Sequence, residues 1–226
     1  MDERSVKEII REELKKLKEL TWGQRLGYVW DYYKPLMVAI LVIAALISIG
    51  VTIYRNKQID HLLNVYMVNC NPISADGEAL AQDFGAYLGG LDKNQMVTFD
   101  TSISLGDDTS QYGMAGQMKL TTLTAAGEID ILLLDPESYQ KYSEVDYFAD
   151  LTTLLSKEQL DEWSGLLIGA GGKPADGGAV YAVDLTDSPV LVATEAYGGG
   201  PVYGCVLAKQ EYSELCDDLF AYLLAS

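Results

Sequence analysis

Twenty consecutive residues, 35–54, carry no charged side chain. At a rise of about 1.5 Å per residue, a helix of this length spans the roughly 30 Å hydrocarbon core of a bilayer. A cleaved signal peptide is the competing interpretation, because it also places basic residues before an apolar run. The run here is longer than the usual stretch of about 7–15 residues, and no small-x-small cleavage site follows it. We therefore expect a retained transmembrane helix that contacts the lipid bilayer through residues 35–54.

The charges that flank this helix predict its orientation. Lysine and arginine favour the cytoplasmic side of a membrane span. The carboxyl-terminal flank holds Arg55 and Lys57, whereas the amino-terminal flank holds Lys15, Lys16, Lys18, Arg25 and Lys34. We expect a single-pass protein of the cell membrane, with residues 1–34 in the cytoplasm, a linker at 55–61 and an extracytoplasmic domain at 62–226.

The two sides of the helix also differ in net charge. Residues 1–54 carry a net charge of +1, and residues 55–226 carry −18. Such a polyanionic domain repels phosphate backbones, so nucleic acid is not an expected partner. Peptides, sugars, cations and other proteins remain open as ligands or partners.

Two short helices are predicted before the membrane segment. Residues 5–20 place Val6, Ile9, Ile10, Leu14, Leu17 and Leu20 near one helical face, with charges elsewhere. Thr21 and Gln24 match a capping box, which predicts that another helix starts at Trp22. Pro35 would then mark a bend or a new helix start. The first helix is either a docking element for a cytoplasmic or membrane partner, or a helix without one.

The remaining chain alternates strands and helices. Residues 62–70 and 96–103 are rich in β-forming residues, and between them Leu80, Phe84, Tyr87 and Leu88 recur at helical spacing. Helices at about 109–127, 136–147 and 156–167 surround a buried strand at 129–135. Further strands are expected at 179–185 and 202–208, and an amphipathic helix at 210–226. This pattern predicts a three-layer α/β domain with a mainly parallel sheet.

A family resemblance can be drawn on residues 125–155. This segment resembles bacterial extracellular solute-binding proteins, in which a helix ends in a small-Gly-acidic turn before an Asp-started strand, a helix and an Asp-Leu element. The matching positions are Gly127, Asp130, 131–134 and 148–151. The whole chain, with VWDYYK at 29–34, also resembles a type of single-pass membrane protein of Gram-positive bacteria. The resemblance implies one lobe of a periplasmic-binding-protein-like fold, although such proteins clamp ligands between two lobes.

Catalytic and metal-binding patterns are sparse. His61 is the single histidine, and it lies close to the predicted membrane exit. Ser138 and Lys141 match Ser-x-x-Lys, but the companion motifs of penicillin-binding enzymes are absent from the sequence. The acidic pairs do not form a calcium loop. We therefore expect no enzyme activity, no cofactor and no metal ion.

The three cysteines, Cys70, Cys205 and Cys216, leave two alternatives open. Cys70 and Cys205 each lie at or near a strand end and could form a disulfide if those strands are neighbours. Buried free thiols are the more ordinary interpretation.

Two functional hypotheses follow. In the first, the domain binds a small molecule, peptide or glycan at the carboxyl ends of its strands, as a tethered receptor or an accessory of a transporter or sensor. In the second, it is an interaction module of a cell-envelope membrane complex and binds no small ligand. For the first hypothesis the candidate binding residues are Asn69, Asn71, Asp100, Thr101, Ser102, Asp135, Glu137 and Ser138.

Overall fold

The computed structural model describes residues 22–56, 59–106, 110–143, 146–209 and 212–225, with side chains only for 34–54 in the first range. The chain consists of two compact units, Met1–Gln58 and Ile59–Ser226. The first helix expected from the sequence, at 5–20, and its neighbour Thr21 lie outside the described residues. The two units are described separately below.

In the first unit the described residues form one long helix, α2 (Trp22–Asn56). The segment Lys34–Tyr54 within it is long and apolar enough to cross a membrane. Pro35 lies inside this helix, so the new helix start that the sequence suggested there does not occur. Proline removes one backbone donor and strains a helix, but it does not always end one.

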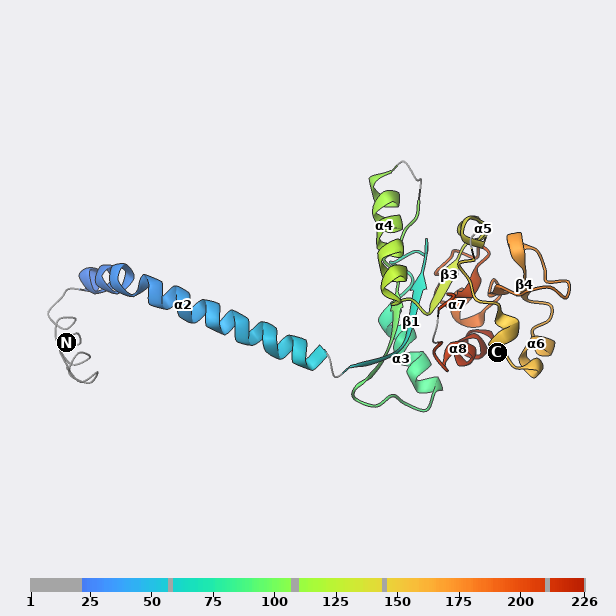
Figure 1. Cartoon of the computed structure of the whole chain (residues 1–226), viewed down its shortest axis with the longest axis horizontal. Helices are drawn as coiled ribbons and strands as arrows, with labels where there is room; N and C mark the ends of the chain where they lie inside the picture. Colours follow the sequence, from blue (N-terminus) through green and yellow to red (C-terminus); the bar gives the residue numbers. More distant parts are fainter. Residues whose placement is uncertain (1–21, 57–58, 107–109, 144–145, 210–211, 226) are drawn as a thin grey trace. The chain divides into compact units, whose positions relative to one another are not determined.

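The second unit is an α/β domain built on one six-stranded sheet (Figure 1). The strand order is β2-β1-β3-β6-β5-β4. The strands are β1 (Asp60–Met67), β2 (Gln95–Asp100), β3 (Ile131–Leu134), β4 (Leu167–Ile168), β5 (Ala182–Asp184) and β6 (Tyr203–Val206). The helices are α3 (Gly77–Tyr87), α4 (Gln111–Ala126), α5 (Pro136–Ser143), α6 (Lys157–Glu162), α7 (Pro189–Ala193) and α8 (Cys216–Leu224), with short 3-10 helices at Leu151–Thr153 and Ala170–Gly172.

The predicted α/β class is confirmed, and the sheet is mixed. Strands β2, β1 and β3 pair in parallel, with Tyr66 opposite Asp100 on one side and Leu132 on the other. From β3 onward every pairing is antiparallel, through β6 and β5 to β4. The expectation of a mainly parallel sheet therefore holds for the first half. It fails in the second half because short apolar strands between glycine-rich loops do not reveal their direction.

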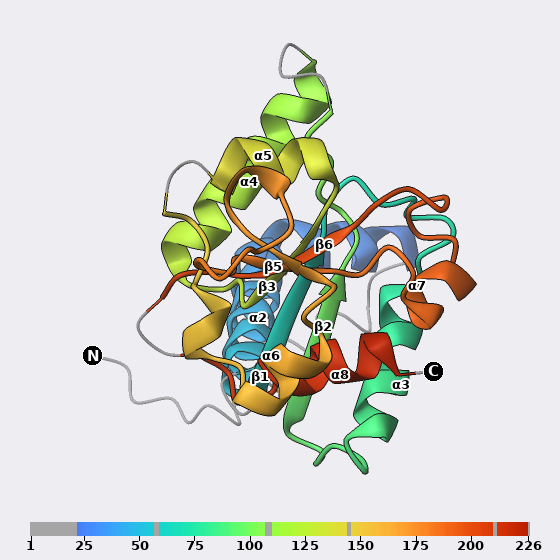
Figure 2. The same ribbon diagram turned by 90° about the vertical axis from the view of Figure 1, so that its right-hand side faces the viewer.

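Helices cover both faces of the sheet (Figure 2). Residues alternate between the faces along each strand. Val65 of β1 packs with Phe84 of α3 and Phe220 of α8, and Leu191 of α7 belongs to the same buried cluster. On the other face Tyr66 packs in a cluster with Leu120 of α4 and Tyr139 of α5. The domain thus has two hydrophobic cores, one on each side of the sheet.

The positions that carry the family resemblance have structural roles. Gly127 ends α4 with a φ of 70°, a left-handed conformation that glycine adopts without steric cost. Asp130 is buried, where it accepts a hydrogen bond from the Asn64 amide and forms an ion pair with Lys209. Asp150 caps the 3-10 helix Leu151–Thr153 and also accepts from the Val180 amide. These residues hold the fold together at places away from the cavities described below.

The cysteines are buried free thiols. Cys70 belongs to the core shared with α3 and α8, whereas Cys205 belongs to the core shared with α4 and α5. Because the two side chains lie on opposite faces of the sheet, the alternative of a Cys70–Cys205 disulfide is not realised.

Candidate functional site

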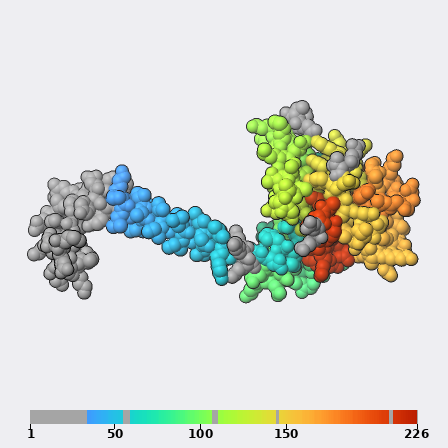
Figure 3. Space-filling model, viewed as in Figure 1, coloured from blue at the N-terminus to red at the C-terminus, as the bar shows by residue number. Residues whose placement is uncertain are grey.

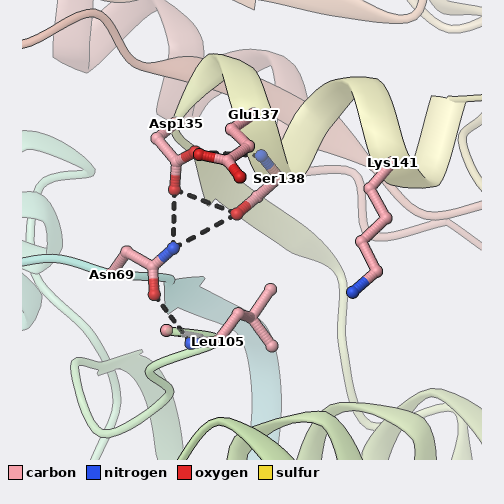
Figure 4. Close-up of a pocket in the computed structure, with 7 residues that line it drawn as sticks. Asn69, Leu105, Asp135, Glu137, Ser138 and Lys141 are labelled. Carbon is pink, nitrogen blue, oxygen red and sulfur yellow. Dashed lines mark hydrogen bonds between the residues drawn. The ribbon is translucent and has the colours of Figure 1, made fainter. Parts of the chain in front are cut away.

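Asn69 follows the carboxyl end of β1 and connects three segments of the chain (Figure 4). Its φ is 56°, a left-handed conformation that asparagine tolerates better than most residues. The side-chain Oδ1 accepts a hydrogen bond from the Leu105 amide at 2.7 Å. The Nδ2 group donates to Asp135 Oδ2 at 2.7 Å and to Ser138 Oγ at 3.2 Å. Asn69 therefore ties the end of β1 to the segment after β2 and to the corner after β3.

Asp135 forms that corner, between β3 and α5. Its Oδ1 accepts a hydrogen bond from the Ser138 amide at 2.9 Å, and its Oδ2 accepts from the Ser138 hydroxyl at 2.9 Å. Pro136 is the first residue of α5, where a missing amide hydrogen is tolerated. The helix cap expected from the sequence is confirmed.

Asp135 remains ionised at neutral pH. Burial raises the pKa of its carboxyl group, but the hydrogen bonds from Ser138 and Asn69 outweigh this effect and hold the pKa below its ordinary value. The site therefore presents a fixed negative charge whose partners are already in place.

A cavity of about 570 Å³ opens beside this network. Its lining combines acidic, amide, hydroxyl and basic side chains from the end of β1, the corner after β3 and α5, and the segment after β2 adds Leu105 and Gly106 (Figure 4). The Lys141 side chain extends from α5 apart from the hydrogen-bonded group, whereas the Ser138 hydroxyl is bonded to Asp135 (Figure 4). The lining residues are Asn69, Leu105, Gly106, Asp135, Glu137, Ser138 and Lys141.

A second cavity, of about 520 Å³, is lined by the same Asn69 and Asp135 together with residues after α7. The Asn71 amide donates to the Ala196 carbonyl at 2.7 Å, which fixes the loop 195–201 against the end of β1. The Tyr197 hydroxyl donates to the Leu133 carbonyl at 3.0 Å. Glu195 has a φ of 50°. Asn69 and Glu195, two residues other than glycine with left-handed backbones, therefore line the same cavity.

The candidate residues from the sequence separate into two groups. Asn69, Asn71, Asp135, Glu137 and Ser138 line one or both cavities. Asp100, Thr101 and Ser102 line neither. Asp100 accepts from the Ser102 amide at 2.7 Å and from Lys119 Nζ at 3.0 Å, and Ser102 also bonds Lys119. This second group anchors α4 to the end of β2.

The cavities are also lined by residues that no sequence pattern indicated, namely Leu105, Gly106, Glu195 and Tyr197. Lys141 was noted in the sequence only as part of a catalytic motif. The glycine-rich stretch at 198–200 was a signal for a loop near a ligand, since glycine lets backbone approach closely. Within the described ranges, no group of three or more His, Cys, Asp or Glu side chains could hold a metal ion.

The described chain is thus an apolar helix followed by a mixed α/β domain with two cavities at the carboxyl ends of its central strands. No protein-family model, no curated protein and no solved structure matches the chain.

Proposed function

We propose that the protein is a membrane-anchored binding protein whose extracytoplasmic domain binds a small molecule, peptide or glycan, as an accessory of a transporter or sensor. The observation that carries the proposal is the hydrogen bond between Asn69 and Asp135 at the carboxyl ends of neighbouring strands β1 and β3. The chain leaves β1 through α3 toward β2, and it crosses back through α4, on the other face, to reach β3. Ligands of open α/β sheets bind at such a change in winding direction.

The volume of the first cavity and the preorganisation of its polar side chains support ligand binding. Small-molecule sites commonly measure about 300–1,000 Å³ and contain a few placed polar groups. The larger cavity, about 570 Å³, falls in this range. Its central polar groups are bonded to one another before any ligand arrives, so little ordering is needed on binding.

The same residues argue for binding rather than catalysis. The Ser138 hydroxyl donates to a carboxylate whose pKa is lowered, which makes Asp135 a weak general base. His61 lies at the amino end of β1, about 20 Å from its carboxyl end at roughly 3.3 Å per residue. It therefore cannot assist Ser138. We propose that the domain has no enzyme activity.

The strand order supports the resemblance to one lobe of a solute-binding protein. Strands β2, β1 and β3 pair in parallel, with α3 and α4 on opposite faces, as expected for one three-layer α/β lobe whose strand ends face a ligand. A second wall for a clamp would come from a partner protein or a second copy. The excess of lysine and arginine on the amino-terminal flank of the anchor supports an extracytoplasmic location for the domain.

A thermal-unfolding screen of the full chain in lipid nanodiscs tests this proposal. Sugars, amino acids, peptides and cations would be added singly, and a ligand present at 100 times its Kd stabilises the folded state by about 2.7 kcal/mol. The stabilisation should disappear in Asp135→Asn. Asp100→Asn is the matched control, because Asp100 lines neither cavity, and it should keep the shift. Loss of the shift in both variants, or in neither, would contradict the proposed site.

One observation favours the alternative of a protein interaction module. Helix α4 stands at the edge of the domain and extends beyond the sheet (Figures 1 and 3). Its outer surface exposes Tyr112 by 85%, Met118 by 73% and Met114 by 56%. Apolar side chains of this size are enriched in protein interfaces. A photo-crosslinker at position 118 should then capture one defined membrane protein, and Met114→Lys should abolish the crosslink. Ligand binding lost with Asp135→Asn would instead favour the receptor.

A further inference from the structure

The two cavities meet at a single pair of residues. Asn69 and Asp135 line both cavities, and among the described residues they are the two that both linings share. The first cavity continues along α5 to Lys141, and the second continues along the loop 195–201. The pair therefore borders two cavities at one end of the sheet, with volumes of about 570 and 520 Å³, which are called the two compartments below. A ligand that lies across the pair can enter both.

Each compartment contains a carboxylate besides the shared one. Glu137 lines the first cavity, Glu195 lines the second, and both side chains are exposed. Lys141, in the first cavity, is the one basic residue among the described lining residues. Residues 59–226 hold 26 acidic and six basic side chains, a net charge of −20. Carboxylates at a cleft in an anionic domain concentrate cations and disfavour anions.

The distribution of three carboxylates over the two compartments implies an elongated ligand. Glu137 and Glu195 belong to different segments, α5 and the loop after α7, and the shared Asp135 lies in the wall between their cavities. An ammonium group carries three donors and can bond a carboxylate and nearby carbonyl oxygens together. A chain with ammonium groups at intervals can therefore place one group in each compartment.

We propose that the two cavities form one site for an open-chain ligand that carries at least two ammonium groups and lies across Asn69 and Asp135. The inference rests on the proposed binding function and narrows its ligand class. Linear polyamines and lysine-containing peptides share this chemistry. Glu137 and Glu195 each bind one end of the chain, and the ordered carboxylate of Asp135 binds its middle.

Isothermal titration calorimetry of the full chain tests this inference, in nanodiscs of uncharged lipid and at constant ionic strength. The probes are butylamine, spermine, trilysine and tetraethylene glycol, a neutral chain. Spermine or trilysine should bind at least about tenfold more tightly than butylamine, because each can form a second charge-assisted hydrogen bond through a second ammonium group. Tetraethylene glycol should not bind. Trilysine and spermine distinguish the peptide from the polyamine as the source of the ammonium groups.

The variants locate the ligand. Glu195→Gln and Glu137→Gln remove one charge from each compartment and should each weaken the longer amine about tenfold. Asp161→Asn removes an exposed carboxylate that lines neither cavity, and it should leave the affinity within about twofold. The urea-unfolding midpoint of each variant verifies its folding.

Several outcomes would overturn the inference and leave the proposed function standing. In one, a neutral compound from the thermal screen binds through Asp135 while no amine does. In another, Glu137→Gln weakens binding and Glu195→Gln does not, which would restrict the ligand to the first cavity. Equal weakening by Asp161→Asn would indicate diffuse attraction to the anionic surface. If no compound in the screen or the amine series binds, the proposed function fails as well.

Discussion

Asn69 Nδ2 lies 2.7 Å from Asp135 Oδ2, although 66 residues separate the two positions in the chain. The contact joins the ends of two adjacent parallel strands, and Leu105 and Ser138 complete it. Four polar or backbone groups from three segments are thereby held in one arrangement at the edge of a cavity.

This arrangement predicts an order of stability for variants of Asn69. Both Asn69→Gly and Asn69→Ala remove the side-chain hydrogen bonds, so each should lower the free energy of unfolding by about 1–2 kcal/mol. Alanine should lower it by about 1 kcal/mol more, because a φ of 56° is strained for a residue with a Cβ atom. Urea unfolding of the full chain measures both. Equal stability of the two variants would show that the left-handed backbone at this position carries no strain.

The lowered pKa of Asp135 predicts that the protein loses stability in acid. Its pKa is lowered in the folded state, so in the unfolded state the carboxyl group takes up its proton first, near its ordinary value of 3.8. The stabilisation it contributes is present above this pH and is lost as the pH falls through the folded-state pKa. Asp135→Asn should therefore be less stable than the wild type at pH 7 and should lose less stability below about pH 4. The measurement is a series of urea titrations between pH 7 and pH 2.

An unchanged pH dependence in Asp135→Asn would contradict this account. Asp100 provides the comparison, because burial raises the pKa of its carboxyl group while hydrogen bonds from Ser102 and Lys119 lower it further than burial raises it. Asp100→Asn should likewise reduce the loss of unfolding free energy at acid pH. Its effect should be independent, since the two carboxyl groups share no hydrogen-bond partner in the described residues. The two effects should then add in the double variant.

The thiols should be unreactive in the folded protein. Burial raises the pKa of Cys70 to about 11 and that of Cys216 to about 12, and it raises the pKa of Cys205 well above its ordinary value. Reaction with a disulfide reagent at pH 8 should be slow in the native state, because the thiolate is the reactive form. In denaturant three thiols should react. One reactive thiol would indicate a disulfide and would require Cys70 and Cys205 to leave opposite faces of the sheet.

The position of the domain relative to the membrane can be tested with introduced cysteines. Ile73 is 94% exposed in the domain, and Ser5 precedes the apolar helix. If the flanking charges set the orientation, a membrane-impermeant maleimide should label Ile73→Cys in intact cells and should label Ser5→Cys only after lysis. The buried native thiols give a low background. Labelling of Ser5→Cys in intact cells would reverse the proposed topology.

Local features of the chain were predictable because they depend on neighbours in sequence. The uncharged run predicted the long helix α2, and helical spacing of Leu80 and Phe84 predicted α3. Asp135 followed by Pro136 predicted the start of α5. Helix ends were less accurate, since the expected helix at 156–167 is observed only at Lys157–Glu162. Trp163, the next residue, is buried in the core shared with α3 and α8, and this tertiary packing outweighs the helix propensity of residues 163–167.

The grouping of the candidate residues could not be read from the sequence. Asp100 and Ser102 lie at the carboxyl end of β2, as Asn69 lies at the carboxyl end of β1. In the sequence both strand ends were therefore equally good candidates for a binding site. In the structure Lys119 of α4 engages Asp100 and Ser102, while Asn69 turns toward Asp135. Which partner each side chain meets depends on how α4 crosses the sheet.

The apolar helix, the charge of the domain, the α/β alternation and the cap at Asp135 follow from the amino-acid sequence, because each depends on composition or on residues a few positions apart. Three features depend on the folded domain: the sheet turns antiparallel after β3, Asn69 meets Asp135, and Glu195 lines a second cavity beside them. These are contacts between distant segments. They depend on strand order and helix packing, which a local pattern of residues does not encode.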